Sequence, residues 1–192
     1  MEPLDGGQAR GATLYRNEAE LNMVFTPAPM FPTEQLYLPT WIVRHRRENR
    51  KKCSLRPLEK RNDFCFSSYP AERAPSLPSG YLLLAFDAPP VTRDDRERGL
   101  LLLDATWRYA AKMERWALAE IAGLEQRSLP SEWVTAYPRC QEDCSEPARG
   151  LASVEALFVA YLLMGRSVDG LLDGYYWKEL FLERNAAALL AV

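Results

Sequence analysis

Asp104 is the acidic residue whose place in the sequence points most directly to chemistry. It follows the apolar run Leu100–Leu103, which is typical of a strand covered on both faces. From Ala105 onward, apolar residues recur at helical spacing. Asp104 therefore lies where a strand gives way to a helix, and open α/β sheets bind ligands at such strand ends. The simpler interpretation is that Asp104 caps the helix and Trp107 packs in the core.

Several common mechanisms lack their residues. His45 is the single histidine, so histidine-rich metal sites and HExxH hydrolases are excluded. A Ser-His-Asp triad would have to use His45. Neither G-x-x-x-x-G-K-[ST] nor G-x-G-x-x-G occurs, which argues against phosphate-binding loops and Rossmann dinucleotide sites. A thiolate zinc site would need all four cysteines, but the spacing of Cys53 and Cys65 is unlike a zinc knuckle. We interpret these two, with Cys140 and Cys144, as incidental thiols and predict no metal.

Length and composition are those of an ordinary globular protein. The chain has 192 residues, of which 47% are hydrophobic and 26% charged, enough for one domain or two small lobes. No apolar run approaches the roughly 20 residues that a membrane span needs. The amino terminus carries early acids and no apolar signal core, so we expect a cytoplasmic protein with reduced thiols.

The net charge of −2 hides a basic cluster. Between residues 44 and 61 there are nine basic residues against Glu48 and Glu59, so this segment carries +7 and the rest of the chain −9. Such a cluster attracts polyanions, although a solvated loop is the other interpretation. The basic cluster consists of Arg44, Arg46, Arg47, Arg50, Lys51, Lys52, Arg56, Lys60 and Arg61.

Further strands are predicted on both sides of Asp104. The β-rich run Leu36–Val43 and the apolar run Tyr81–Phe86 predict two of them, separated by a break rich in serine and proline. Trp133–Tyr137 predicts another, closed by Pro138. Since strands alternate with helical patterns, the chain belongs to the α/β class.

Two helices are predicted near the carboxyl end. Ser153 is placed to cap a helix that runs to Met164 and is stopped by Gly165. A last helix is expected from about 175 to 190. Residues 1–34 contain glycines and prolines with little apolar periodicity, and we interpret them as an extension that is only partly ordered.

Five blocks of the sequence resemble one family. Leu102–Trp107 reads LLDATW and resembles the D-x-[TS]-W signature of the DTW-domain superfamily, which contains RNA aminocarboxypropyltransferases. Lys52–Ser54 is similar to its D-P-K-K-C-[ST] segment. Leu129–Pro130 with Thr135–Pro138 resembles L-P…A-A-N-P, and Leu151–Ala156 resembles L-S-[CT]-V-E-A. The blocks occur in family order.

The resemblance implies a two-lobed α/β protein. Its carboxyl-terminal lobe would be a SPOUT-like knotted fold that binds S-adenosylmethionine, beside a smaller amino-terminal α/β lobe. We accordingly expect three parts: residues 1–34 as an amino-terminal extension, 35–98 as a basic RNA-binding lobe and 99–192 as the S-adenosylmethionine-binding lobe.

The implied activity is transfer of the 3-amino-3-carboxypropyl group of S-adenosylmethionine, the co-substrate, to N3 of a uridine or pseudouridine in RNA. Asp104 occupies the position of the family carboxylate and would take or orient the N3 proton. Trp107 would contact the sulfonium by cation-π attraction. The basic cluster would hold RNA phosphates. The resemblance assigns cofactor contacts to Ser54, Trp107, Leu129, Ala136, Leu151 and Ser153.

The target and the type of transfer have alternatives. Tyr137 stands where the family has asparagine, and Ala152-Ser153 where it has Ser followed by Cys or Thr. The cysteines typical of the transfer-RNA branch are absent from the amino end, which favours ribosomal RNA, within a ribosomal precursor, over transfer RNA. The alternatives are a SPOUT-type RNA methyltransferase and a non-catalytic RNA-binding or ribosome-assembly factor. We expect a monomer without membrane contact.

Overall fold

A computed structural model describes residues 37–49, 53–138 and 150–192. The predicted extension, 1–34, lies outside the described residues. Five strands form a single parallel sheet in the order β2-β1-β4-β3-β5. The strands are β1 (Thr40–His45), β2 (Phe64–Tyr69), β3 (Tyr81–Leu84), β4 (Gly99–Asp104) and β5 (Glu125–Arg127). The α/β class is therefore confirmed.

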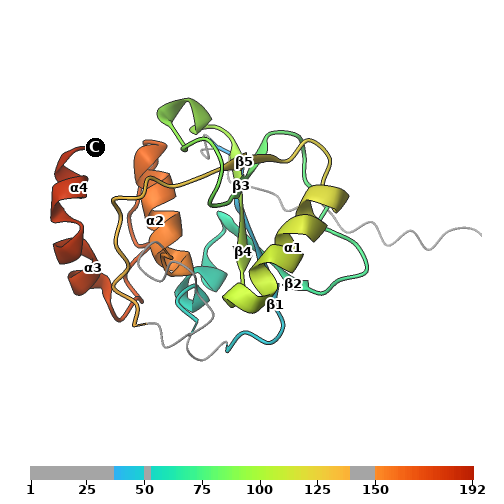
Figure 1. Ribbon diagram of the computed structural model, residues 1–192, viewed down its shortest axis with the longest axis horizontal. Helices are drawn as coiled ribbons and strands as arrows, with labels where there is room; N and C mark the ends of the chain where they lie inside the picture. Colours follow the sequence, from blue (N-terminus) through green and yellow to red (C-terminus); the bar gives the residue numbers. More distant parts are fainter. Residues whose placement is uncertain (1–36, 50–52, 139–149) are drawn as a thin grey trace, which may run out of the picture. The chain divides into compact units, whose positions relative to one another are not determined.

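Helices cover both faces of the sheet. The α-helices are α1 (Trp107–Glu120), α2 (Ser153–Leu163), α3 (Lys178–Arg184) and α4 (Ala186–Leu190), and the 3-10 helices are η1 (Arg56–Lys60) and η2 (Arg93–Asp95). Helix α1 lies on one side of the sheet, and α2, α3 and α4 lie on the other (Figure 1). Strands from both 35–98 and 99–192 pair in this one sheet. The two-lobed division and the knot remain predictions.

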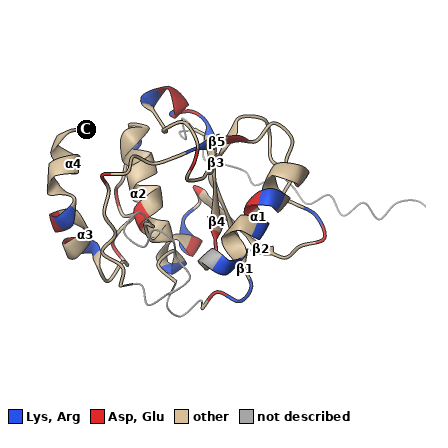
Figure 2. Cartoon of the chain, in the orientation of Figure 1, with Lys and Arg blue, Asp and Glu red and all other residues tan. Residues whose placement is uncertain are grey.

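The alternation of side chains along the buried strands divides the core in two. Ile42 and Leu102 pack against the α2 side, whereas Val43 and Leu101 pack against α1. Helix α1 carries charged residues of both signs along its length, while α2 carries only Glu155 (Figure 2). Helix α1 is therefore the amphipathic outer helix, and α2 is the buried one.

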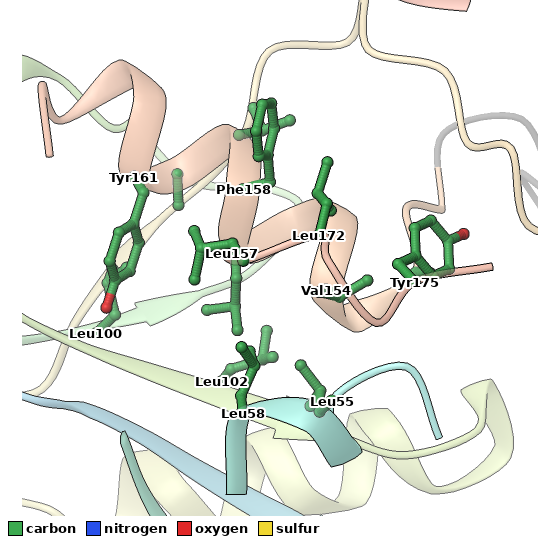
Figure 3. Close-up of a cluster of buried hydrophobic side chains, with 14 of the residues drawn as sticks. Leu55, Leu58, Leu100, Leu102, Val154, Leu157, Phe158, Tyr161, Leu172 and Tyr175 are labelled. Carbon is green, nitrogen blue, oxygen red and sulfur yellow. The ribbon is translucent and has the colours of Figure 1, made fainter. Parts of the chain in front are cut away.

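Helix α2 joins the sheet to the carboxyl-terminal segment. Leu157 and Tyr161 are fully buried and point from α2 toward the sheet (Figure 3). Leu58 of η1 and Leu172 belong to the same buried cluster. The predicted stop is confirmed, because Gly165 follows the helix with a φ of +67° that side chains rarely adopt. Burial of Leu157 and Tyr161 therefore holds α2 against this face of the sheet.

Two predictions about the carboxyl-terminal half were wrong for a common reason, Asn185. Residues 133–137 do not form a strand, because the backbone of Val134 bonds instead to the side-chain amide of Asn185 (N to Oδ1 2.7 Å, Nδ2 to O 2.8 Å). The helix expected over 175–190 is divided at the same residue into α3 and α4. The apolar pattern around Trp133, which is 2% exposed, reflects burial of an irregular segment.

Replacing Gly99 by alanine should destabilise the sheet. A Cβ at this position of β4 would lie 2.5 Å from the ring of Tyr81. That ring is buried, and its hydroxyl donates a hydrogen bond to the carbonyl of Pro39 (2.8 Å), so it is not free to move aside. We expect the free energy of unfolding, measured in urea, to fall by about 1–3 kcal/mol. An unchanged urea midpoint would contradict this account.

Candidate functional site

Asp104 is the last residue of β4 and the centre of a side-chain cluster. Its Oδ2 accepts hydrogen bonds from Arg44 Nε (2.7 Å) and from the Cys53 thiol (3.4 Å), and its Oδ1 accepts one from Ser153 Oγ (2.8 Å). Asp104 is buried, with 6% of the residue exposed. The predicted handover from strand to helix at Asp104 is confirmed, but the helix cap is Thr106. Asp104 is therefore not a cap, and three other segments of the chain fix its orientation.

Register places Arg44 beside Asp104. The two residues are direct partners in the parallel ladder between β1 and β4, so their side chains leave the sheet on the same face. Arg44 Nη1 also bonds Glu59 Oε1 at 2.5 Å. Burial works against the charge of Arg44, but the bonds to the two carboxylates outweigh it and raise the pKa of the guanidinium. Arg44 is a permanent cation at the candidate site.

The basic cluster is consequently not one continuous surface. Arg44 was predicted to bind RNA phosphates, which requires a side chain on the surface. The structure buries it, with only 8% of the residue exposed. Arg61 forms an ion pair with Asp63 at 2.7 Å. Four members of the cluster are exposed: Arg46, Arg47, Arg56 and Lys60. The remaining three, Arg50, Lys51 and Lys52, lie outside the described residues. Binding of RNA by the basic cluster remains a prediction.

Ser153 reaches Asp104 because it is the first residue of α2. The cap is Ala152, so the prediction that Ser153 caps this helix was wrong. Its hydroxyl turns to Asp104, while the cap position is served by Glu155, whose Oε2 accepts the N–H of Ala152 at 2.6 Å. A side chain three residues inside the helix is the usual partner for the cap N–H. The hydroxyl of Ser153 is thereby left for the site.

A second acid supports the start of α1. Oε1 of Glu48 accepts the N–H of Thr106 at 2.7 Å. Burial raises the pKa of Glu48, and the hydrogen bond from Thr106 opposes that shift. Glu48 therefore ties the loop after β1 to the turn that follows Asp104.

A cavity of about 530 Å³ opens beside Asp104 at the carboxyl ends of β3, β4 and β5. Leu103 and Ala105, the neighbours of Asp104, both line it, and so does Ser153. This is the size of a small-molecule site, and its place at the strand ends is where α/β sheets bind ligands. The charged side chains that the described residues contribute to its wall, Asp87 and Glu114, are both acidic. The cavity therefore favours a ligand that carries positive charge.

The residues predicted to contact the cofactor divide into two groups. Leu129, Leu151 and Ser153 line the cavity. Ala136 is buried and is not among the lining residues, and its N–H is already donated to Glu155 Oε1 at 2.9 Å. Ser54 lies in the turn after Cys53 and is not among the residues that line the cavity.

Trp107 begins α1, which places its backbone one turn from the cavity residues Ala110 and Ala111, but its side chain lies outside the described part of the structure. Its predicted contact with the sulfonium therefore remains a prediction.

Several candidate residues were missed in the sequence. The pairing of Arg44 with Asp104 has no local signal, because the two are 60 positions apart and only the sheet register joins them. Asp87 follows the predicted strand Tyr81–Phe86, and that position at a strand end was a usable signal. Glu114 lies on α1, where its Oε1 accepts a hydrogen bond from Gln126 Nε2 at 2.7 Å.

The Cys53 thiol should be unreactive in the folded chain. Burial raises its pKa to about 11, and the neighbouring charge of Asp104 contributes. Near pH 8 the thiolate fraction should then be about a hundredfold lower than at the ordinary thiol pKa of 9.0. We expect iodoacetamide to alkylate Cys53 about a hundredfold more slowly in the native chain than in urea, as followed by peptide mass spectrometry. Equal rates in both states would contradict the buried contact with Asp104.

Two negative findings concern the described residues alone. No helix there is long and apolar enough to cross a membrane. No group of three or more His, Cys, Asp or Glu side chains there is arranged to hold a metal ion. Cys140 and Cys144 lie outside the described residues, so the four-cysteine arrangement considered above is not tested.

The chain shares its fold with one solved protein. That structure is described as the SAM-dependent rRNA:acp-transferase Tsr3 from Vulcanisaeta distributa. The TM-score is 0.61 and the sequence identity 23%, over 80% of this chain and 82% of the other. The sequence matches no family model and no curated protein. At this level of identity, the likeness shows the fold.

Proposed function

We propose that this protein transfers the 3-amino-3-carboxypropyl group of S-adenosylmethionine to N3 of a uridine or pseudouridine in RNA, with ribosomal RNA as the favoured target. The observation that carries the proposal is the buried Asp104 carboxylate, bonded to Ser153 on the wall of a cavity at the strand ends. The fold shared with the SAM-dependent rRNA:acp-transferase Tsr3 from Vulcanisaeta distributa supports it.

The cavity fits S-adenosylmethionine in size and in charge. Its volume of about 530 Å³ lies within the range of small-ligand sites. Leu84, Leu129 and Leu151 offer apolar contacts to an adenine ring. The cofactor carries a sulfonium and an ammonium against one carboxylate, and the acidic pair Asp87 and Glu114 complements that net positive charge.

The bound cofactor would supply an electrophilic carbon next to its sulfonium. In the overall reaction the bond from N3 to that carbon forms, the carbon–sulfur bond breaks, and methylthioadenosine leaves with the bond electrons. The N3 proton must be removed as the new bond forms. A carboxylate oxygen can accept two hydrogen bonds, and within the described chain Oδ1 of Asp104 receives one, from Ser153. Asp104 can therefore take or orient the N3 proton at Oδ1.

The neighbours of Asp104 hold it in position for this role. Arg44 and Cys53 bond Oδ2, which leaves the side chain little rotational freedom. Because the carboxylate is already fixed, positioning it costs little at the moment of reaction. The exposed basic residues Arg46 and Arg47, in the turn after β1, would hold the RNA backbone close to this edge of the sheet.

Isotopic label tests the proposal directly. The protein is incubated with ribosomal RNA that lacks modifications and with S-adenosylmethionine labelled in the carboxyl carbon or in the methyl carbon, and label in the RNA is counted. We expect carboxyl label alone, with methylthioadenosine as by-product. Methyl label with S-adenosylhomocysteine would identify a methyltransferase. Absence of both labels, together with failure to bind S-adenosylmethionine at millimolar concentration, would favour an RNA-binding factor.

A further inference from the structure

Basic side chains lie along one exposed side of α1 (Figure 2). Arg108, Lys112 and Arg115 are exposed, and at 3.6 residues per turn they fall within an arc of about 60° around the helix. The two acids of α1, Glu114 and Glu120, lie outside this arc. Helix α1 therefore presents a stripe of positive charge on the side opposite to its buried residues.

The stripe continues into the turn that follows β1. Arg47 Nη1 donates a hydrogen bond to Tyr109 Oη on α1 at 2.8 Å, and the guanidinium lies 5.9 Å from the centre of the Tyr109 ring. The His45 ring stacks on Tyr109, with 4.1 Å between the ring centres. Burial lowers the pKa of His45, and the charges of Arg47, Arg46 and Lys112 lower it further. Cations from both segments therefore gather around one buried ring.

Four of these cations lack an acidic partner. Within the described residues no ion pair joins a carboxylate to Arg46, Arg47, Lys112 or Arg115, whereas other arginines of the surface are paired, as Arg98 is with Glu125 at 2.7 Å. Exposed cations that no acid neutralises create a local field that attracts a polyanion. We refer to the following residues together as the α1 surface: Arg46, Arg47, Arg108, Lys112 and Arg115.

The α1 surface begins at the candidate site. Helix α1 starts at Trp107, directly after the turn that follows Asp104. The turn after β1 reaches the same place, since Glu48 Oε1 accepts the N–H of Thr106 at 2.7 Å. A polyanionic chain that lies along α1 and crosses this turn would therefore pass beside the carboxyl end of β4.

The exposed cations of η1 lie on the other face of the sheet. Arg56 and Lys60 belong to η1, and Leu58 of that helix packs in the core on the α2 side. Helix α1 packs through Met113 in the core on the opposite side. Glu59 lies between the two cations of η1 in the sequence, whereas α1 has no acid within its basic arc. The two faces offer RNA separate surfaces, and charge of a single sign favours the one on α1.

We propose that the α1 surface binds the phosphate backbone of the RNA strand that carries the target nucleotide. The inference rests on the proposed function, because that reaction requires RNA to reach the carboxyl end of β4. Lys112 and Arg115 would contact phosphates along α1, and Arg46 and Arg47 would contact the phosphates closest to the site. Phosphate contacts position a strand without reading its bases, so this surface supplies affinity and register. The cations of η1 take no part.

Salt-dependent RNA binding tests the α1 surface without turnover. Fluorescence anisotropy measures the affinity of the full chain, without cofactor, for an oligouridylate of about 12 nucleotides over a range of salt concentrations. The double variant Lys112→Gln/Arg115→Gln should bind about tenfold or more weakly near 0.1 M salt. The slope of log K against log salt should fall in magnitude by about 1.4, since each lost contact to a single strand removes about 0.7.

Two control variants separate the position of the charge from its amount. Arg56→Gln/Lys60→Gln removes the same two positive charges from exposed positions of η1, and it should change RNA affinity less than about twofold. Lys112→Arg/Arg115→Lys keeps both charges on α1 and should bind RNA as the native chain does. Neither Lys112 nor Arg115 lines the cofactor cavity, so all three variants should melt normally and bind S-adenosylmethionine with native affinity.

The outcomes separate the α1 surface from the proposed function. The surface is overturned if the native chain does not bind the oligouridylate, if the α1 and η1 pairs weaken binding equally, or if the η1 pair weakens it more. A loss of affinity that is confined to Lys112→Gln/Arg115→Gln, with the slope reduced, supports it. The proposed function fails separately, if RNA binds through α1 but no carboxyl label reaches it, and the α1 surface then stands as that of an RNA-binding factor.

Discussion

Replacing Asp104 by asparagine should lower the rate of aminocarboxypropyl transfer by about 10²–10⁴-fold and leave the affinity for S-adenosylmethionine nearly unchanged. The amide has the size of the carboxylate but cannot take the N3 proton. Only one of its terminal atoms accepts hydrogen bonds, whereas Arg44 and Ser153 both donate to Asp104. Single-turnover rates with carboxyl-labelled cofactor and saturating RNA measure the loss.

The control for Asp104 is Ser153→Ala, which removes one hydrogen bond to Oδ1 and keeps the carboxylate. Its rate should fall less than about tenfold, since a single hydrogen bond contributes about 1 kcal/mol. Thermal melting of both variants must be recorded, because Asp104→Asn also leaves the buried charge of Arg44 with Glu59 alone. A folded Asp104→Asn variant with the full rate would reduce Asp104 to a structural partner of Arg44.

Replacing Glu155 by alanine should lower the free energy of unfolding by about 4 kcal/mol. The Glu155 side chain is fully buried in the first turn of α2. It accepts hydrogen bonds from Thr135 Oγ1 (2.6 Å), Ala136 N (2.9 Å), Ala152 N (2.6 Å) and Tyr175 Oη (2.8 Å). Truncation removes the acceptor that these four buried groups share. Urea denaturation measures the loss against a typical total of about 5–15 kcal/mol.

Thr135→Val is the control for Glu155, because it removes one donor to the carboxylate and the acceptor of the Tyr137 N–H (3.0 Å), and it retains the carboxylate with its other partners. The loss of these two hydrogen bonds should cost about 2 kcal/mol. Losses of similar size in the two variants would mean that Glu155 does not hold the irregular segment and α2 together. Because α2 also carries Ser153 to the site, Glu155→Ala should weaken S-adenosylmethionine binding at temperatures where it is still folded.

The sequence alone determined the parts of the site that depend on local pattern. The apolar run before Asp104 and the helical spacing after it predicted a strand end, and the structure places β4 and α1 there. The end of α2 near Gly165 was predicted because glycine adopts a positive φ readily, and the identity of that one residue is visible in the sequence. These signals are short-range, so they can be recognised without knowing which strands are neighbours.

Tertiary structure alone decided which residues meet at Asp104. Strand β1 lies between β2 and β4 in a register that brings Arg44 to Asp104, and this moves a member of the basic cluster from the surface into the site. The side chain of Asn185 likewise bonds the backbone of Val134, which a neighbouring strand would do in a sheet. The same residue separates α3 from α4. Strand order and register follow from packing of the whole core. A side-chain amide can replace backbone pairing only when folding brings it close to that backbone. Periodicity along the chain carries neither kind of information.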